Sequence, residues 1–232
     1  MGIKATLTIL NLLFFVFLYG QDFGIISDKD GFANIRESPN IHSKIIDKLS
    51  NGHLVSVFSG EGNWLNIDYS INNQILKNGN IYKDRVKMVS EFKKVPKISE
   101  NANNLILADK KFKIKIALKK FEKNNHSYKY VKDNPDQILL IDKRQYFGKD
   151  GGIPTIEYQK IEIEIGNEII KLPKVALHNL YEPNLHSTEA NYDEKNKILY
   201  ISAMNSDGAG GYLVIWKIEN GIYKERFIAY GF

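Results

Sequence analysis

The stretch 112–119 reads FKIKIALK, and apolar residues alternate with lysines along most of it. Successive side chains of a β-strand point to opposite faces, so Phe112, Ile114, Ile116 and Leu118 fall on one face and the lysines on the other. The pattern predicts a strand with one buried face and one solvated face.

Further strands are expected on both sides of a second alternating stretch, IEIEI at 161–165. Gly166-Asn167 is a hairpin signal after it, and apolar runs follow at 169–172, 198–203, 212–218 and 223–229. Only 175–181 resembles a helix, of about two turns, closed by Pro183. Residues 105–232 are therefore predicted to form a mostly antiparallel β domain with one short helix.

The first half of the chain contains short apolar runs about ten residues apart, separated by Gly, Asn and Asp. These runs are 32–35, 45–49, 54–58, 64–69 and 80–86. Such spacing is typical of a small barrel or sandwich, which we expect over residues 21–90. The stretch EFKKVPKISENANN at 91–104 disturbs the periodicity with Pro96, several lysines and a cluster of Asn, and we interpret it as a linker.

The first 20 residues have the pattern of a signal peptide. Lys4 precedes an uncharged, largely apolar run at 5–19, and Gly20 offers a small residue at a cleavage site. An uncleaved anchor is the alternative, but the run is shorter than the roughly 20 apolar residues of a spanning helix. We expect export to the periplasm or beyond it, with no stable transmembrane span after cleavage.

Composition limits the classes of function. The chain has a net charge of +5, and its lysines are scattered among Asp and Glu without an arginine-rich run, which favours a solvated surface over nucleic-acid binding. Cysteine is absent, which excludes disulfides, thiolate metal ligands, a cysteine nucleophile and a lipidated cysteine.

Four segments of the first half resemble bacterial SH3 domains. They are DGFANIRESP at 30–39, SKIIDKL at 43–49 followed by Gly52, GNWLNI at 62–67 and GNIY at 79–82. The resemblance implies an SH3-like barrel that contacts cell-wall peptides, peptidoglycan or a protein. It departs from the family pattern at 37–39, where Glu-Ser-Pro replaces Ser-Gly-Pro, and at 72–74, which lengthen the loop before the last strand.

Trp64 is the most informative residue of this half. It either closes the barrel as a core or rim residue, or forms one wall of an aromatic groove with Tyr69 or Tyr82. The three aromatic residues are therefore candidate ligand contacts.

No arrangement of residues typical of a catalytic or metal site is evident. Of the five histidines only His178 and His186 are close in sequence, and His186 with Glu189 lies in a polar stretch without a helix to align them. Glu162 and Glu164 alternate with isoleucine, as on a solvated strand face. We therefore expect neither a metal nor a cofactor.

The stretch MNSDGAGGY at 204–212 is the most distinctive of the second half. It is either a glycine-rich hairpin loop or a binding loop in which backbone amides approach a ligand and Asn205, Asp207 and Tyr212 add contacts. KDGGIP at 149–154 is a second polar turn of this kind.

These features predict an exported, non-catalytic binding protein whose partner is a cell-wall peptide, peptidoglycan or an envelope protein. An inhibitor-like or immunity-like role is compatible with that prediction. One alternative is a cell-wall hydrolase with an unrecognised catalytic C-terminal domain, for which Asp207, Glu157 and His178 are the best residues. Another is an envelope structural protein without a small ligand.

Overall fold

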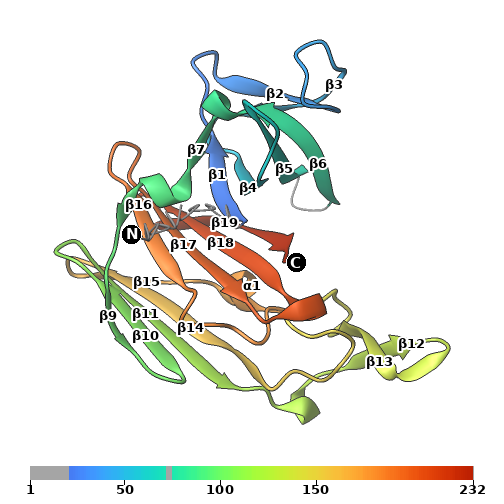
Figure 1. Ribbon diagram of the computed structural model, residues 1–232. Coiled ribbons are helices and arrows are strands. Elements are labelled where there is room, and N and C mark those ends of the chain that lie inside the picture. Colours follow the sequence, from blue (N-terminus) through green and yellow to red (C-terminus); the bar gives the residue numbers. More distant parts are fainter. Residues whose placement is uncertain (1–20, 72–74, 232) are drawn as a thin grey trace, which may run out of the picture.

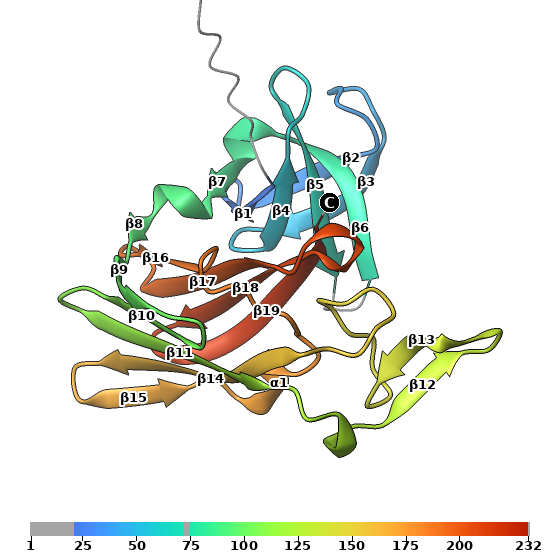
Figure 2. The ribbon, with the colours of Figure 1, turned by 60° about the horizontal axis from the view of Figure 1, so that its bottom comes forward.

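The computed structural model describes residues 21–71 and 75–231, which form stacked layers of antiparallel β-sheet (Figures 1 and 2). The prediction of a mainly β chain is confirmed, and α1 (Lys174–Leu177) is the one α-helix in the described ranges. The expected signal peptide at 1–20 lies outside the described residues.

The N-terminal sheet has seven strands in the order β3-β2-β6-β5-β4-β1-β7. Their bounds are β1 (Asp22–Ile26), β2 (Phe32–Arg36), β3 (Ile45–Ser50), β4 (Leu54–Phe58), β5 (Trp64–Ile71), β6 (Ile75–Tyr82) and β7 (Val86–Met88). One cluster of buried side chains takes members from β1 to β6, so the sheet curls around its own core. No pairing between the end strands β3 and β7 closes the sheet in the described part of the chain.

The second half contains two five-stranded sheets. The first has the order β15-β14-β11-β10-β9, with β9 (Lys97–Glu100), β10 (Asn104–Ala108), β11 (Phe112–Lys120), β14 (Ile156–Ile165) and β15 (Glu168–Lys171). The second has the order β19-β18-β17-β16-β8, with β8 (Lys93–Lys94), β16 (Glu189–Asp193), β17 (Ile198–Asn205), β18 (Tyr212–Glu219) and β19 (Ile222–Tyr230).

The main core lies between these two sheets. Ile114 of β11 is opposite Ile163 of β14, so the two alternating stretches of the sequence point their isoleucines the same way. Trp216 of β18 is fully buried against them, and its indole Nε1 donates to the carbonyl of Ala176 at 2.8 Å. The strand predicted at 112–119 and the hairpin predicted at Gly166 are both confirmed.

The opposite face of the β19-β18-β17-β16-β8 sheet packs on the N-terminal sheet. Phe23 of β1 meets Phe227 of β19 with ring centroids 6.0 Å apart, and Phe92 stacks on Tyr200 at 5.7 Å. These side chains belong to one buried cluster. This sheet is thus covered on both faces, and the two halves of the chain share a core (Figure 1).

The segment 91–104 differs from the linker that we expected. Lys93 and Lys94 of β8 pair with Tyr192 and Asn191 of β16, whereas β9 pairs with β10. The segment therefore crosses from one sheet of the sandwich to the other, and Val95 between the two strands is fully buried.

Smaller elements complete the fold. Short 3₁₀ turns occupy Lys83–Arg85, Val89–Glu91, Lys123–Asn125 and Gly208–Gly210. The hairpin of β12 (Tyr128–Val131) and β13 (Asn134–Ile141) projects from the sandwich (Figure 2). The helix is shorter than the predicted 175–181, because His178 is extended and Asn179 takes a left-handed φ of 58°. No helix in the described ranges is long and apolar enough to cross a membrane.

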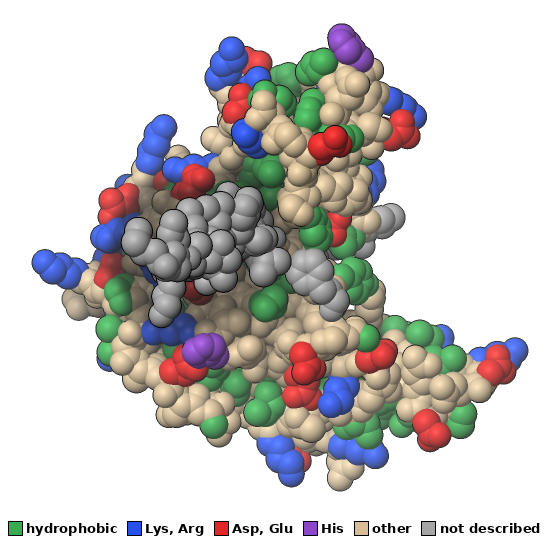
Figure 3. Space-filling model, in the orientation of Figure 1, with side chains coloured by type: hydrophobic (Ala, Val, Ile, Leu, Met, Phe, Trp, Pro, Cys, Tyr) green, Lys and Arg blue, Asp and Glu red, His purple; other side chains and the backbone are tan. Residues whose placement is uncertain are grey.

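Charged side chains of both signs are intermixed over the face seen in Figure 3. Glu162 on the exposed face of β14 binds Lys160 at 2.7 Å and Lys171 at 3.4 Å, and Glu164 binds Lys115. On the exposed face of β14, acids therefore pair with lysines of the same strand and of the neighbouring strands β11 and β15, as is common for a solvated sheet surface.

Candidate functional site

Trp64 and Tyr82 form an aromatic pair on the outside of the N-terminal sheet. Trp64 begins β5, Tyr82 ends β6, and the antiparallel register places them opposite each other. Their ring centroids are 5.5 Å apart and the ring planes are 87° apart, an edge-to-face contact that stabilises both. Tyr82 keeps 36% of its surface exposed and Trp64 is half-buried. The structure thus brings these two candidate contacts together.

Trp64 lines two cavities. One, of about 360 Å³, also has Phe32, Tyr82, Asp30 and Arg36 in its wall. The other, of about 750 Å³, is bordered mainly by apolar side chains of β4, β5 and β7. Trp64 is therefore placed to contact a ligand in either cavity.

The rim of the smaller cavity carries fixed charges of both signs. Asp28 forms an ion pair with Arg85, and the amide of Asp30 together with that guanidinium keeps the pKa of Asp28 below its ordinary value. Arg36 is oriented by a hydrogen bond from its guanidinium to the carbonyl of Ser43 at 2.6 Å. A short peptide with both an amine and a carboxylate would find a counter-charge for each.

Tyr69 does not lie in this groove. It is fully buried, its hydroxyl donates to Asp47 at 2.8 Å, and Asp47 also binds Lys77 at 2.8 Å. Trp64 and Tyr69 are five residues apart on β5, so they point to opposite faces of the strand. Strand periodicity alone was sufficient to separate them.

The two polar loops that stood out in the sequence meet at a third cavity, of about 670 Å³. Ser206 donates from its hydroxyl to the carbonyl of Gly148 at 2.9 Å, and the amide of Gly148 donates to Gly210 at 3.2 Å. Gly148 has a φ of 101°, and a Cβ there would lie 2.0 Å from the carbonyl oxygen of Tyr181. Asp207 is exposed at the mouth of this cavity.

Asn205 and Tyr212 support this loop from below. Asn205 is fully buried; its Oδ1 accepts from the amide of Asn184 at 2.8 Å, and its Nδ2 donates to the hydroxyl of Tyr158 at 3.0 Å. Tyr212 is also fully buried and donates to the carbonyl of Tyr181 at 3.0 Å, and burial raises its pKa. Of the three candidates in this loop, only Asp207 faces the cavity.

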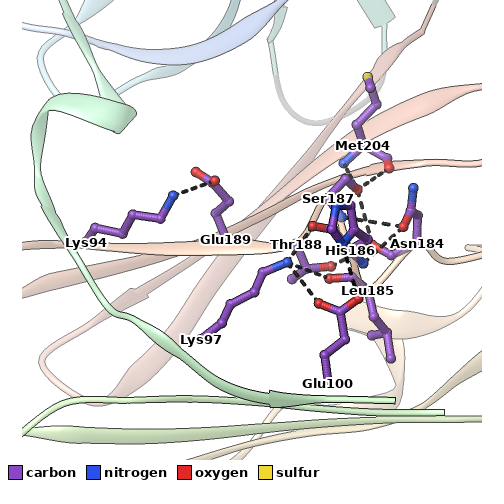
Figure 4. Close-up of polar contacts among 10 residues, drawn as sticks. All are labelled: Lys94, Lys97, Glu100, Asn184, Leu185, His186, Ser187, Thr188, Glu189 and Met204. Atoms are coloured by element: carbon purple, nitrogen blue, oxygen red, sulfur yellow. Dashed lines mark hydrogen bonds and ion pairs between the residues drawn. The ribbon is translucent and has the colours of Figure 1, made fainter. Parts of the chain in front are cut away.

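A clamp at the sheet edge holds the neighbouring turn (Figure 4). Lys97 of β9 donates from Nζ to the carbonyls of Leu185, at 3.2 Å, and His186. Ser187 donates to the carbonyl of Met204 and accepts from its amide at 3.2 Å. These contacts tie β9 to the end of β17 and fix the turn whose Asn184 lines the Asp207 cavity.

The spacing of His186 and Glu189 does not produce a metal site. Glu189 binds Lys94 at 2.6 Å, whereas the His186 Nδ1 lies 3.3 Å from Glu100 (Figure 4). Over the described ranges, no three His, Asp or Glu side chains gather closely enough to hold a metal ion.

The residues considered for a hydrolase lie apart. Glu157 binds Lys119 at 3.0 Å, and neither it nor His178 lines the cavity that Asp207 faces. His178 follows α1, where burial and the nearby Arg226 and Arg144 lower its pKa.

Comparison with known proteins gives no relative: no protein-family model, no curated protein and no solved structure matches this chain.

Proposed function

We propose that this chain is an exported, non-catalytic binding protein, and that its N-terminal sheet is an SH3-like barrel of the bacterial type which contacts cell-wall peptides. The single observation that carries the proposal is the Trp64–Tyr82 pair, together with the two cavities that Trp64 lines. Exposed aromatic side chains bind peptides well because they offer a large contact area and lose little conformational entropy.

The sheet itself supports the barrel interpretation. Residues of the SH3-like segments are compatible with a small barrel: Ile35 and Ile67 are fully buried in the core of the sheet, and Gly52 and Gly62 have positive φ at turns. Curling of the sheet around one core is the other supporting feature.

The ligand class follows from the rim. Asp30 and Arg36 stand beside the aromatic rings, so the cavity suits a short peptide with free charges of both signs. Peptidoglycan peptides carry both amines and carboxylates. The exposed loop with Asp207 is available to contact a protein partner, as an inhibitor-like role would require.

The test measures co-sedimentation of the chain from Gln21 onward with purified, insoluble peptidoglycan. Tyr82→Ala is expected to weaken binding about tenfold, equivalent to ~1.4 kcal/mol. Tyr130→Ala is the matched control, because Tyr130 is a strand tyrosine with a similar exposure of 41% on the projecting hairpin. Absence of sedimentation, or equal losses in the two variants, would overturn the proposal.

A further inference from the structure

A cavity of about 660 Å³ lies where the N-terminal sheet meets the sandwich. Ser70 and Leu76 border it from β5 and β6, and Arg144 and Arg226 border it from the sandwich. In Figure 2 the loop after β13 approaches the ends of β5 and β6 at this place. None of the aromatic residues of the proposed peptide groove lines it, so the two sites are separate.

Within the described residues, the guanidinium of Arg226 is bound by neutral acceptors alone. It donates to the carbonyls of Ala176 at 3.1 Å and His178 at 2.9 Å, and to Asn179 Oδ1 at 2.7 Å. These contacts clamp the end of α1, and they leave about two of the five N–H groups of a guanidinium for another acceptor. Burial lowers the pKa of Arg226, which reflects the cost of a desolvated charge that has no anion beside it.

Arg144 adds a second positive charge to this site. Arg144 lies near enough to lower the pKa values of Arg226 and His178, and neither arginine has an ion pair with any residue of the described ranges. Glu225 also borders the cavity but binds Lys217 at 3.6 Å.

The wall beside the arginines is the free edge of a sheet. Among the described strands β19 is the last of its sheet and pairs with β18 alone, so alternate N–H and C=O groups along it point outward. At the end of this edge the carbonyl of Tyr230 accepts from the side-chain amide of Gln21 at 3.0 Å. Tyr230 lies four residues from Arg226 along this edge, which is about 13 Å of extended chain. Its ring lies 5.9 Å from that of Phe147, and its hydroxyl accepts from Gln145 at 2.6 Å.

We propose that this cavity binds an extended peptide that lies along β19 as an added strand, with a carboxylate of the peptide between Arg144 and Arg226 and an apolar side chain on Tyr230. The two arginines favour a carboxylate, the unpaired edge of β19 favours an extended backbone, and the ring of Tyr230 favours an apolar side chain. Strand addition is an established mode of peptide recognition.

The test uses fluorescence anisotropy of the chain from Gln21 onward with three labelled, apolar pentapeptides. One has a free C-terminal carboxylate, one is the same peptide with a C-terminal amide, and one is amidated but carries an internal Glu. Either the peptide with the free C-terminal carboxylate or the amidated peptide with an internal Glu is expected to bind at least about tenfold more tightly than the plain amide. The peptide that does so shows whether the bound carboxylate is a C-terminus or a side chain.

Arg144→Gln is expected to remove most of this preference. The adjacent Lys143→Gln is the matched control, because Lys143 is also exposed and does not line the cavity. Hydrogen exchange is expected to slow at backbone amides of β19 when the peptide is bound. Equal binding of all three peptides, equal effects of the two variants, or no protection along β19 would overturn the proposal. Loss of binding in Tyr82→Ala with none in Arg144→Gln would assign the peptide to the barrel groove instead.

Discussion

Replacing Asn205 by alanine is expected to destabilise the fold strongly. The substitution would leave the Asn184 amide and the Tyr158 hydroxyl without the partners they have in the structure, at 2.8 Å and 3.0 Å. A buried polar group that loses its partner costs about 1–3 kcal/mol, and this cost applies in full to the hydroxyl of Tyr158. The hydrogen bond to the amide of Asn184, an exposed residue, is part-buried and adds less, so we expect a total loss of about 3 kcal/mol. For a chain of this size, that corresponds to a fall in Tm of roughly 6–12 °C.

Tyr200→Phe is the matched control for this prediction. The hydroxyl of Tyr200 is buried and has no hydrogen-bond partner in the described part of the chain. Its removal is therefore expected to change the free energy of unfolding by less than about 0.5 kcal/mol, or to stabilise the protein slightly.

Urea denaturation followed by circular dichroism measures both variants. Trp216, whose ring lies 5.4 Å from that of Tyr158, gives a local fluorescence signal for the same transition. A loss below about 1 kcal/mol for Asn205→Ala would refute the structural role of this side chain. A comparable loss for Tyr200→Phe would show that the presence of hydrogen-bond partners does not decide which of the two substitutions is more destabilising.

Three further predictions concern the shared core, pH and the Asp207 cavity. Phe23→Ala is expected to lower the free energy of unfolding by about 3–4 kcal/mol, because it removes a buried ring that packs on Phe227. Unfolding of the unaltered chain should be a single transition by both circular dichroism and fluorescence. Two separate transitions would contradict a shared core. Burial lowers the pKa of His53 below its ordinary value of 6.5, so the unfolded chain takes up a proton first as pH falls. Stability should therefore begin to drop as pH falls through about 6.5 and should continue to drop toward the lower pKa of the folded state. A drop that is unchanged in His53→Gln would exclude this histidine as a cause. In thermal unfolding, Gly148→Ala should be less stable than Gly166→Ala by at least about 2 kcal/mol. Both glycines have positive φ, but of the two only Gly148 has a carbonyl oxygen within 4 Å of the added Cβ. Equal losses of stability would show that this contact has no effect.

Parts of the candidate sites were readable from the sequence. The Trp64–Tyr82 pair and the loop of Asp207 were both predicted as possible contacts, because aromatic residues in a strand and glycine-rich polar turns have recognisable local chemistry. Asn205 and Tyr212 were grouped with Asp207 although they are buried beneath it. A sequence run does not show which of its residues point inward at the end of a strand.

The cavity of Arg144 and Arg226 gave no signal in the sequence. Its polar groups come from the loop after β13, the end of α1 and the edge of β19, which are far apart along the chain. Only the packing of these elements brings together two arginines that form no ion pair within the described ranges, so no local pattern could reveal the site.

Alternation identified the strands at 112–119 and 161–165 because each has one buried and one solvated face. The apolar runs at 198–203 and 212–218 were also predicted to be strands, but apolar and polar residues do not alternate strictly in them. The tertiary structure supplies the reason. The sheet of β17 and β18 is covered by the sandwich core on one face and by the N-terminal sheet on the other, so nearly every residue is buried. Periodicity records how many faces of a strand are covered, whereas the identity of the covering element depends on contacts between distant parts of the chain.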